Sequence, residues 1–220
     1  MWLKGKMKVF IDISTYCNAA CPQCHRTNPK TLRKADWLPL IQWSLNDFKQ
    51  AYGTNTMNTI RAFDICGTWG DPAMNRDLLP IIQYIMDNSQ ASVKIHTNGS
   101  LRDEAFWWDL CVAGGDRLSI CFAVDGLDQD MHAFYRRKTE LDTILKHINI
   151  CSLTRSHVST KTIVFKHNED YLDEIETMCI SAGSHTHSTT ISDRFGWSHD
   201  GRFEFNDEAG QLQVLEVSSL

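Results

Sequence analysis

Three cysteines lie within eight residues near the start of the chain: Cys17, Cys21 and Cys24, in the sequence CNAACPQC. Because this C-x3-C-x2-C loop directly follows an apolar run, the three thiolates can converge without any long-range folding constraint. Thiolates are the usual ligands of iron–sulfur clusters. A closed zinc site needs a fourth ligand, and His25 is too close to Cys24 to complete the same tetrahedron. The spacing favours a cluster with one open coordination position over zinc or three incidental cysteines.

The other cysteines occur singly, in apolar or amphipathic surroundings. They are Cys66, Cys111, Cys121, Cys151 and Cys179. In such surroundings cysteine behaves as a small buried hydrophobe. We therefore expect these five to pack in the interior and predict one metal cluster per chain.

Composition limits the class of protein. The 220 residues, 42% of them hydrophobic, suffice for one domain with a sizeable core. A formal charge of −5 supplies no broad basic surface, so a nucleic-acid-binding role is unexpected. The start of the chain lacks the apolar stretch of a signal peptide, and no run approaches the roughly 20 apolar residues of a membrane span. We expect a soluble, cytoplasmic protein with no membrane contact.

Apolar strand-like runs alternate with segments of helical period along the chain. The predicted strands are 8–14, 60–66, 92–97, 117–124, 160–165 and 187–191. The predicted helices carry the stripe Ile41, Leu45, Phe48 and Tyr52, then Leu78, Ile82 and Ile85 behind an Asn75 cap, and continue at 104–112, 129–150 and 171–182. This alternation is typical of βαβ units with a parallel sheet. Six units are too few for a complete eight-stranded barrel.

The predicted fold is therefore α/β, a partial (β/α)6 TIM-like barrel with the cysteine loop after the first strand. Residues 1–200 are expected to form the core domain, and 201–220 a short tail that suits a hairpin. Ligands of parallel α/β folds bind at the carboxyl ends of the strands. Polar and glycine-containing segments follow these strands, so we expect the chemistry to gather there.

The cysteine loop and the later strand ends together resemble the radical SAM superfamily over residues 7–192. The resemblance is closest to the SPASM and molybdenum-cofactor-cyclase group, without its C-terminal auxiliary-cluster domain. It implies that Cys17, Cys21 and Cys24 hold three irons of a [4Fe–4S] cluster, whose fourth iron binds S-adenosyl-L-methionine. The implied reaction is reductive cleavage of S-adenosylmethionine to a 5′-deoxyadenosyl radical that abstracts hydrogen from a substrate.

Three strand ends carry the resemblance further. Trp69, Gly70 and Asp71, followed by proline, are similar to the family's GGEP segment, which meets the ammonium group of the cosubstrate. Asn98 lies in a Thr-Asn-Gly segment, and Asp125 begins a D-G…H-x3-R pattern that ends at Arg136. The resemblance implies a carboxylate-binding role for Arg136 and ribose-side or structural roles for Asn98 and Asp125. A turn, a helix cap and a solvated helix charge are the alternatives for Asn98, Asp125 and Arg136.

The sequence departs from the family pattern at several positions. Gln23 replaces the aromatic residue that commonly precedes the third cysteine, Trp69 replaces a glycine, and Ala123 stands where many members have serine. His25 or Tyr16 could substitute for the missing aromatic. These departures keep open an iron–sulfur electron-transfer or scaffold protein with a degenerate cosubstrate site.

The resemblance suggests a peptide substrate first and a nucleotide-like small molecule second. It also implies an external electron donor such as a flavodoxin or ferredoxin. Because the sequence has no auxiliary cysteine cluster and stops soon after the sixth predicted strand, we expect either that a partner chain or homo-oligomer closes the barrel, or that the enzyme is minimal or truncated with an open barrel mouth. Cys66, at the end of the second strand, either packs there or donates a hydrogen atom to a substrate radical. His185, His187 and His199 form only a weak pattern for a second metal.

Overall fold

The computed structural model describes residues 7–196 and 200–220, and it contains one six-stranded sheet and one hairpin. The sheet strands are β1 Met7–Ile11, β2 Ile60–Ile65, β3 Ser92–Thr97, β4 Leu118–Ala123, β5 His157–Val164 and β6 Thr186–Ile191. They lie in sequence order, and each pairs parallel to the next. The sheet is open, with β1 and β6 at its edges. The predicted α/β fold with six parallel strands and an unclosed barrel is confirmed.

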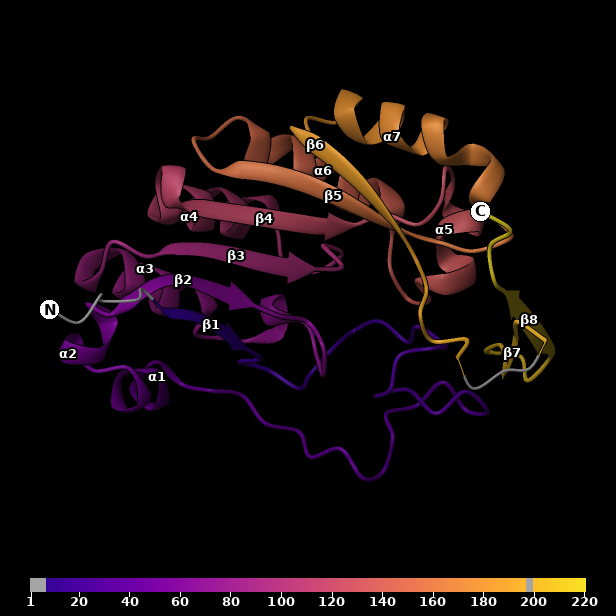
Figure 1. The fold of residues 1–220 in the computed structure, drawn as a ribbon, viewed down its shortest axis with the longest axis horizontal. Coiled ribbons are helices and arrows are strands. Elements are labelled where there is room, and N and C mark those ends of the chain that lie inside the picture. The colour runs from indigo at the N-terminus through magenta and orange to yellow at the C-terminus, as the bar shows by residue number, and fades with distance from the viewer. Residues whose placement is uncertain (1–6, 197–199) are drawn as a thin grey trace, which may run out of the picture.

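Helices connect the strands and bury one face of the sheet (Figure 1). They are α1 Leu45–Ala51, α2 Thr54–Met57, α3 Leu78–Asn88, α4 Glu104–Gly114, α5 Gln129–Tyr135, α6 Leu141–Ser152 and α7 Leu172–Ser181, with 3-10 turns at Pro72–Met74, Gly115–Arg117 and Glu169–Tyr171. The core lies between helices and sheet, where Ile81, Trp107 and Ile148 pack with Ile95 and Ile120. No helix in the described part of the chain is long and apolar enough to cross a membrane.

The tail contains the antiparallel pair β7 Arg202–Asn206 and β8 Leu212–Glu216. This hairpin lies beyond the carboxyl ends of the sheet strands, on the side to which the arrows of β3 and β4 point (Figure 1). Phe205 and Leu215 are buried in a second apolar cluster together with Ala20, Cys21 and Phe165. The hairpin therefore packs behind the cysteine loop.

Several predicted element boundaries were wrong. The first helix begins at Leu45, because Ser44 caps it in a capping box with Asp47, and Ile41 lies outside it, 49% exposed. Asn75 does not cap α3, which begins after Asp77. The Asn75 side chain instead donates to the carbonyls of Ile13 and Trp43, at 2.6 and 2.9 Å. It thereby fastens the irregular segment between β1 and α1 to the helical layer.

Candidate functional site

A cavity of about 230 Å³ lies at the carboxyl ends of the sheet strands. Its lining includes the three cysteines of the loop and residues from the ends of β2, β3, β4 and β5. Of the residues predicted for the site, those lining the cavity are Cys17, Cys21, Cys24, Gly70, Asp71, Asn98 and Arg136. The cavity thus brings together residues that are far apart in the sequence, such as Cys17 and Arg136.

Local hydrogen bonds shape the cysteine loop. The amide of Cys24 donates to the carbonyl of Cys21 at 3.0 Å, and the amide of Ala20 donates to the carbonyl of Arg137 at 3.0 Å. The first bond turns the chain so that two cysteines come close together. The second ties the loop to the segment that follows α5. The loop is therefore shaped by a bond of its own and attached by another to a neighbouring segment.

The environment of the thiols fits a metal cluster. Burial raises the pKa of Cys21 to about 11, although the Arg136 guanidinium opposes the rise. Burial also raises the pKa of Cys17, and the nearby Asp71 raises it further. Buried thiols of this kind become thiolates when a metal supplies the compensating charge. Cys17, Cys21 and Cys24 would hold the cluster, and the fourth cysteine that lines the cavity, Cys121, lies on β4 outside the loop.

A single metal ion fits less well than a cluster. Among the described residues, no three Cys, His, Asp or Glu side chains lie close enough together to hold one ion. A cluster spreads its cysteines over different irons, so it needs no such tight convergence. His185 and His187 make hydrogen bonds within the sheet, and His199 falls outside the described residues.

The loop after β2 closely approaches the segment that follows β1 at Gly70. A Cβ atom at Gly70 would lie 2.3 Å from the carbonyl oxygen of Ser14 and 2.6 Å from that of Tyr16. The next amide, that of Asp71, donates to the carbonyl of Tyr16 at 2.7 Å. Only glycine permits this contact. It sets the Gly-Asp-Pro turn directly against the start of the cysteine loop.

The Asp71 carboxylate is saturated with hydrogen bonds from its own chain. It accepts from the Ala73 amide at 2.9 Å, from Thr97 Oγ1 at 2.9 Å, and from the Asn98 amide and Nδ2 at 2.7 and 2.6 Å. An ionised carboxylate offers about four acceptor positions. Burial raises the pKa of Asp71, while the hydrogen bonds from Asn98 and Ala73 oppose the rise. Asp71 thus joins the ends of β2 and β3.

Asn98 extends the hydrogen-bond network of Asp71 to the cysteine loop. Its Nδ2 lies 2.9 Å from Asn18 Oδ1 and 3.8 Å from Cys17 Sγ. The side chain therefore reaches from the third strand end to the first cysteine. The Thr-Asn-Gly segment serves here to orient the loop, and Asn98 is more than a turn residue.

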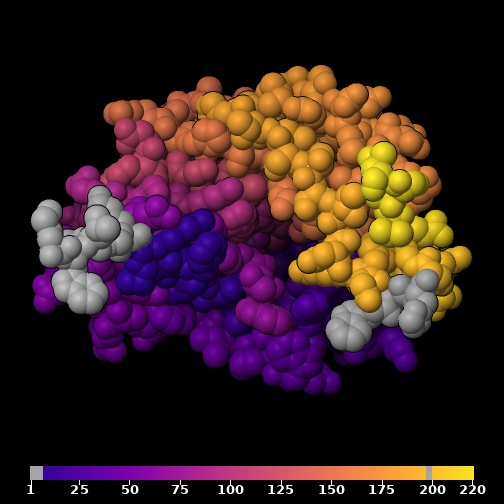
Figure 2. All heavy atoms as spheres, in the orientation of Figure 1, coloured from indigo at the N-terminus to yellow at the C-terminus, as the bar shows by residue number. Residues whose placement is uncertain are grey.

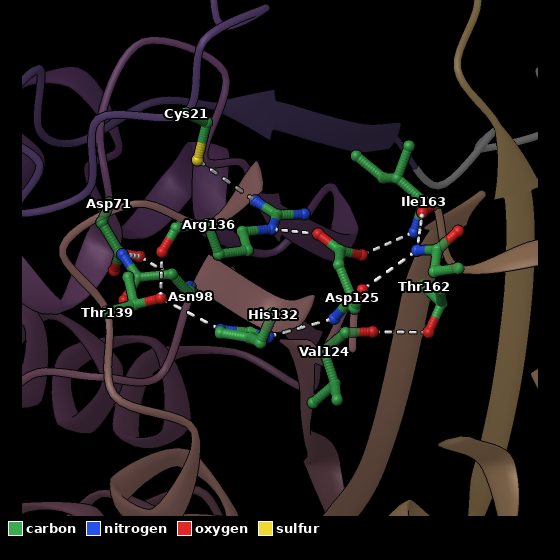
Figure 3. A network of polar contacts seen from close by, with 11 residues as sticks. Cys21, Asp71, Asn98, Val124, Asp125, His132, Arg136, Thr139, Thr162 and Ile163 are labelled. Carbon is green, nitrogen blue, oxygen red and sulfur yellow. Dashed lines mark hydrogen bonds and ion pairs between the residues drawn. The ribbon is translucent and has the colours of Figure 1, made fainter. Parts of the chain in front are cut away.

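Arg136 lies between the fourth strand end and the cysteine loop (Figure 3). Its Nε donates to the Asp125 carboxylate, and its Nη1 lies 3.9 Å from Cys21 Sγ. Asp125 is fully buried and also accepts from the Ile163 amide at 2.6 Å. Asp125 does not line the cavity; it holds the guanidinium that does.

His132 supports the Asp125–Arg136 pair through two hydrogen bonds of its ring. Its Nδ1 accepts from the Asp125 amide at 3.2 Å, and its Nε2 lies 3.0 Å from Thr139 Oγ1 (Figure 3). Since Thr139 Oγ1 donates to the Arg136 carbonyl, it accepts from His132, whose proton is therefore on Nε2. Burial lowers the pKa of His132 to about 4, which keeps the ring neutral. The H-x3-R spacing places His132 and Arg136 one helical turn apart.

Trp69, which was predicted for the site, and Gln23, which departs from the family pattern, both make their contacts elsewhere. Trp69 does not line the cavity, and its ring packs edge-on against Trp37 at 5.5 Å. Gln23 is buried, accepts a hydrogen bond from Ser192 Oγ at 2.9 Å, and through its carbonyl accepts one from Arg194. The position before the third cysteine therefore fastens the chain that follows β6.

Sequence reasoning missed five charged, imidazole or thiol side chains of the cavity. They are Arg26, His96, Cys121, Lys161 and Arg194. For His96, Cys121 and Lys161 the available signal was their position on β3, β4 and β5, because every second residue of these strands faces away from the helices. Cys121 was predicted only to pack. Conversely, Cys66 lies outside the lining of this cavity, and its Sγ is 3.5 Å from the Asp64 carbonyl.

Solved structures share this architecture. The fold superimposes on Streptococcus suis SuiB bound to the precursor peptide SuiA with a TM-score of 0.66 over 89% of the chain, at 16% identity. It superimposes on SuiB bound to S-adenosylmethionine with a TM-score of 0.66 over 86% of the chain, at 15% identity. The match to native anSMEcpe with bound AdoMet has a TM-score of 0.64 over 84% of the chain, at 12% identity. The chain shares the fold of SuiB and anSMEcpe.

This shared fold corresponds to only part of those proteins. It covers 42% of SuiB in the peptide complex and 50% of anSMEcpe. No protein-family model matches the sequence, and no curated protein sequence matches it. At these identities the likeness is one of fold.

Proposed function

We propose that this chain is a radical SAM enzyme that binds one [4Fe–4S] cluster and cleaves S-adenosyl-L-methionine reductively. The observation that carries the proposal is the convergence of Cys17, Cys21, Cys24 and Arg136 on one cavity at the carboxyl ends of six parallel strands. Three cysteine thiolates would bind three irons of the cluster and leave the fourth iron free for a cosubstrate. When bound, the reduced cluster supplies the electron that splits the sulfonium of S-adenosylmethionine into methionine and a 5′-deoxyadenosyl radical.

The residues of the chain contribute binding, orientation and exclusion of water. Cys17, Cys21 and Cys24 are the proposed iron ligands. The outer N–H groups of Arg136, of which Nη1 also faces Cys21 Sγ at 3.9 Å, suit the carboxylate of the cosubstrate, since Asp125 engages only Nε and fixes the direction of the guanidinium. Because the Asp71 carboxylate is already saturated, we propose that backbone groups around Gly70 meet the ammonium group, and that Asp71 and Asn98 hold them in place.

The proposed substrate is a peptide. The support is the fold shared with SuiB, whose structure was solved with its precursor peptide SuiA. An external donor such as a flavodoxin or ferredoxin would reduce the cluster, and a partner chain or second copy would complete the open barrel. The eight free cysteines suit a reducing compartment, so we place the protein in the cytoplasm.

The deciding experiment is anaerobic reconstitution with iron and sulfide, followed by reduction with dithionite in the presence of S-adenosylmethionine. We expect about four iron atoms per chain and formation of 5′-deoxyadenosine detected by mass spectrometry. Cys21→Ala is expected to lose both iron and product. Cys179→Ala is the matched control, because Cys179 is buried in the helical core away from the cavity.

The same experiment separates the second candidate function. The side chains of Asp71 and Gln23 are hydrogen-bonded to other residues of the chain instead of being free to contact a cosubstrate. This favours an electron-transfer or scaffold protein with a degenerate cosubstrate site. That protein would bind the cluster and form no 5′-deoxyadenosine. Stoichiometric zinc in a colourless, air-stable protein would contradict both candidates.

A further inference from the structure

Arg26 places a buried positive charge in the cavity of the cysteines. It lies two residues after Cys24, in the segment between β1 and α1, and it lines the cavity together with the three cysteines. Figure 2 shows a hollow between this segment, in purple, and the orange atoms of β5 and β6. The Arg26 side chain is only 8% exposed. Arginine is rarely buried to this degree unless an anion accompanies it.

The backbone around Arg26 is fixed by two hydrogen bonds. The Thr27 amide donates to the Cys24 carbonyl at 2.8 Å, and the Ala35 amide donates to the Arg26 carbonyl at 2.6 Å. The first bond continues the turn of the cysteine loop, and the second attaches Arg26 to the returning part of the same segment. The start of the Arg26 side chain is therefore held beside the third cysteine.

The guanidinium of Arg26 reaches the backbone on both sides of Cys17. Its Nη2 donates to the Thr15 carbonyl at 3.3 Å, and its Nη1 donates to the Ala19 carbonyl at 3.5 Å. Thr15 lies two residues before Cys17, and Ala19 lies two residues after it. The side chain of Arg26 therefore runs from the third cysteine of the loop to the first.

These two contacts do not satisfy the guanidinium. Both are longer than the usual N–H···O distance of about 2.9 to 3.0 Å. The Nε of Arg26 is buried and has no hydrogen-bond partner, and within the described chain no carboxylate forms an ion pair with Arg26. Asp71, the carboxylate of the cavity lining, is occupied by Thr97 and Asn98. Arg26 thus carries a buried charge that the chain leaves uncompensated.

The cysteines supply the negative charge that matches this position. Their thiols become thiolates when they bind iron. Three thiolates give the loaded cluster a net negative charge, and its one-electron reduction adds another. Net charge and hydrogen bonds near the sulfurs are among the factors that set the reduction potential of such a cluster. The other arginines of the cavity are engaged, Arg136 with Asp125 and Arg194 with the Gln23 carbonyl.

We propose that Arg26 raises the reduction potential of the cluster by stabilising the electron that the external donor delivers. This inference rests on the proposed function, because it assigns a further residue to the same cluster. The donor, a flavodoxin or ferredoxin, is oxidised by one electron and the cluster is reduced by one. No bond breaks and Arg26 keeps its proton, so it acts through its charge alone.

The test measures the reduction potential in the reconstituted protein without S-adenosylmethionine. Samples are poised with dithionite and redox mediators, and the reduced cluster is quantified by electron paramagnetic resonance. In Arg26→Gln we expect the ratio of reduced to oxidised cluster at a fixed potential to fall about tenfold, which equals about 59 mV for a one-electron couple. Arg26→Lys keeps the charge, so its ratio should stay within about threefold of the wild type. Arg33→Gln is the matched control and should change nothing, because Arg33 is exposed in the same segment.

An unchanged potential in Arg26→Gln would overturn the inference. Weaker binding of S-adenosylmethionine in that variant, at an unchanged potential, would assign Arg26 to the cosubstrate instead. Equal shifts in Arg26→Gln and Arg26→Lys would overturn the inference in favour of the guanidinium's hydrogen bonds. A shift of the same size in Arg33→Gln would overturn it in favour of surface charge in general.

The iron content of each variant keeps the test decisive where a variant loads poorly. Loading of Arg26→Lys but not of Arg26→Gln would support the inference, because the two variants differ in charge. Failure of Arg26→Lys to load would overturn it, in favour of a clamp that only shapes the loop. A wild-type chain that binds no iron contradicts the proposed function itself. Formation of 5′-deoxyadenosine is measured separately, so the failure of this inference and the failure of the proposed function give different results.

Discussion

Asp71 and Asn98 are joined through one carboxylate oxygen, which accepts from the Asn98 amide at 2.7 Å and from the Asn98 Nδ2 at 2.6 Å. The same Nδ2 faces Cys17 Sγ at 3.8 Å. A chain of contacts therefore runs from the end of β2 through the end of β3 to the first cysteine. The acidic residue of the Gly-Asp-Pro turn acts on the cysteine loop through Asn98.

Replacing Asp71 should destabilise the fold as well as the site. Asp71→Ala leaves the buried amides of Ala73 and Asn98 and the Thr97 hydroxyl without their acceptor, and unpaired buried donors cost about 1 to 3 kcal/mol each. We expect the free energy of unfolding in urea to fall by about 3 kcal/mol or more. Asp71→Asn should lie between, since its amide keeps one acceptor oxygen. Asp109→Ala, on the exposed side of α4, should change stability by less than about 0.5 kcal/mol. A loss below about 1 kcal/mol in Asp71→Ala would show that water replaces the carboxylate.

Arg136 and Asp125 should behave as a coupled pair. Arg136→Met leaves the fully buried Asp125 carboxylate without its cation, and breaking a buried pair in this way costs about 3 to 5 kcal/mol. Adding Asp125→Asn to Arg136→Met should restore part of that loss, because the uncompensated charge disappears. Urea unfolding of the two single variants and the double variant gives the coupling energy. Arg76→Met, at an exposed arginine, is the control. Additive losses would mean that the two side chains do not stabilise one another.

The sequence was sufficient to predict the six parallel strands, because alternating and apolar runs report burial directly. It also located the three cysteines, whose convergence is local. The segment between β1 and α1 could not be predicted, since its position depends on distant bonds such as those of Asn75 to Ile13 and Trp43. Asn75 has the residue type of a helix cap, and only tertiary contacts show that it bridges two segments instead.

The cavity was predicted incompletely for a related reason. The motif residues Gly70, Asp71, Asn98 and Arg136 could be named from their positions after strands. Whether a side chain touches the cavity or supports another residue depends on three-dimensional packing. Cys121 has the apolar neighbours of a core residue and yet lines the cavity.

Stability should fall in mild acid because of His132. Burial lowers its pKa in the folded protein to about 4, below the roughly 6.5 of an unfolded chain. The unfolded state therefore binds the proton first, and the stabilisation present above about pH 6.5 is lost as the pH falls toward 4. The expected loss is on the order of 3 kcal/mol once the pH is below 4, and the part that falls between pH 7.5 and pH 5 is about 2 kcal/mol. Urea unfolding of the wild type and of His132→Gln at pH 7.5 and pH 5 measures it. The variant should lose less stability than the wild type over this interval, and an equal loss would assign the pH dependence to other groups.

The hairpin should stabilise the cysteine loop through Phe205. This ring is buried in the apolar cluster that includes Ala20 and Cys21, and the neighbouring Asn206 amide donates to the Pro29 carbonyl at 2.9 Å. Phe205→Ala should lower the free energy of unfolding by about 3 to 5 kcal/mol through the cavity it leaves. Because that cavity lies behind Cys21, the variant should also lose iron faster to a chelator after anaerobic reconstitution. Leu212→Ala is the matched control on the same hairpin, since Leu212 is 61% exposed. Unchanged iron release in a destabilised Phe205→Ala would show that the hairpin supports the fold without supporting the loop.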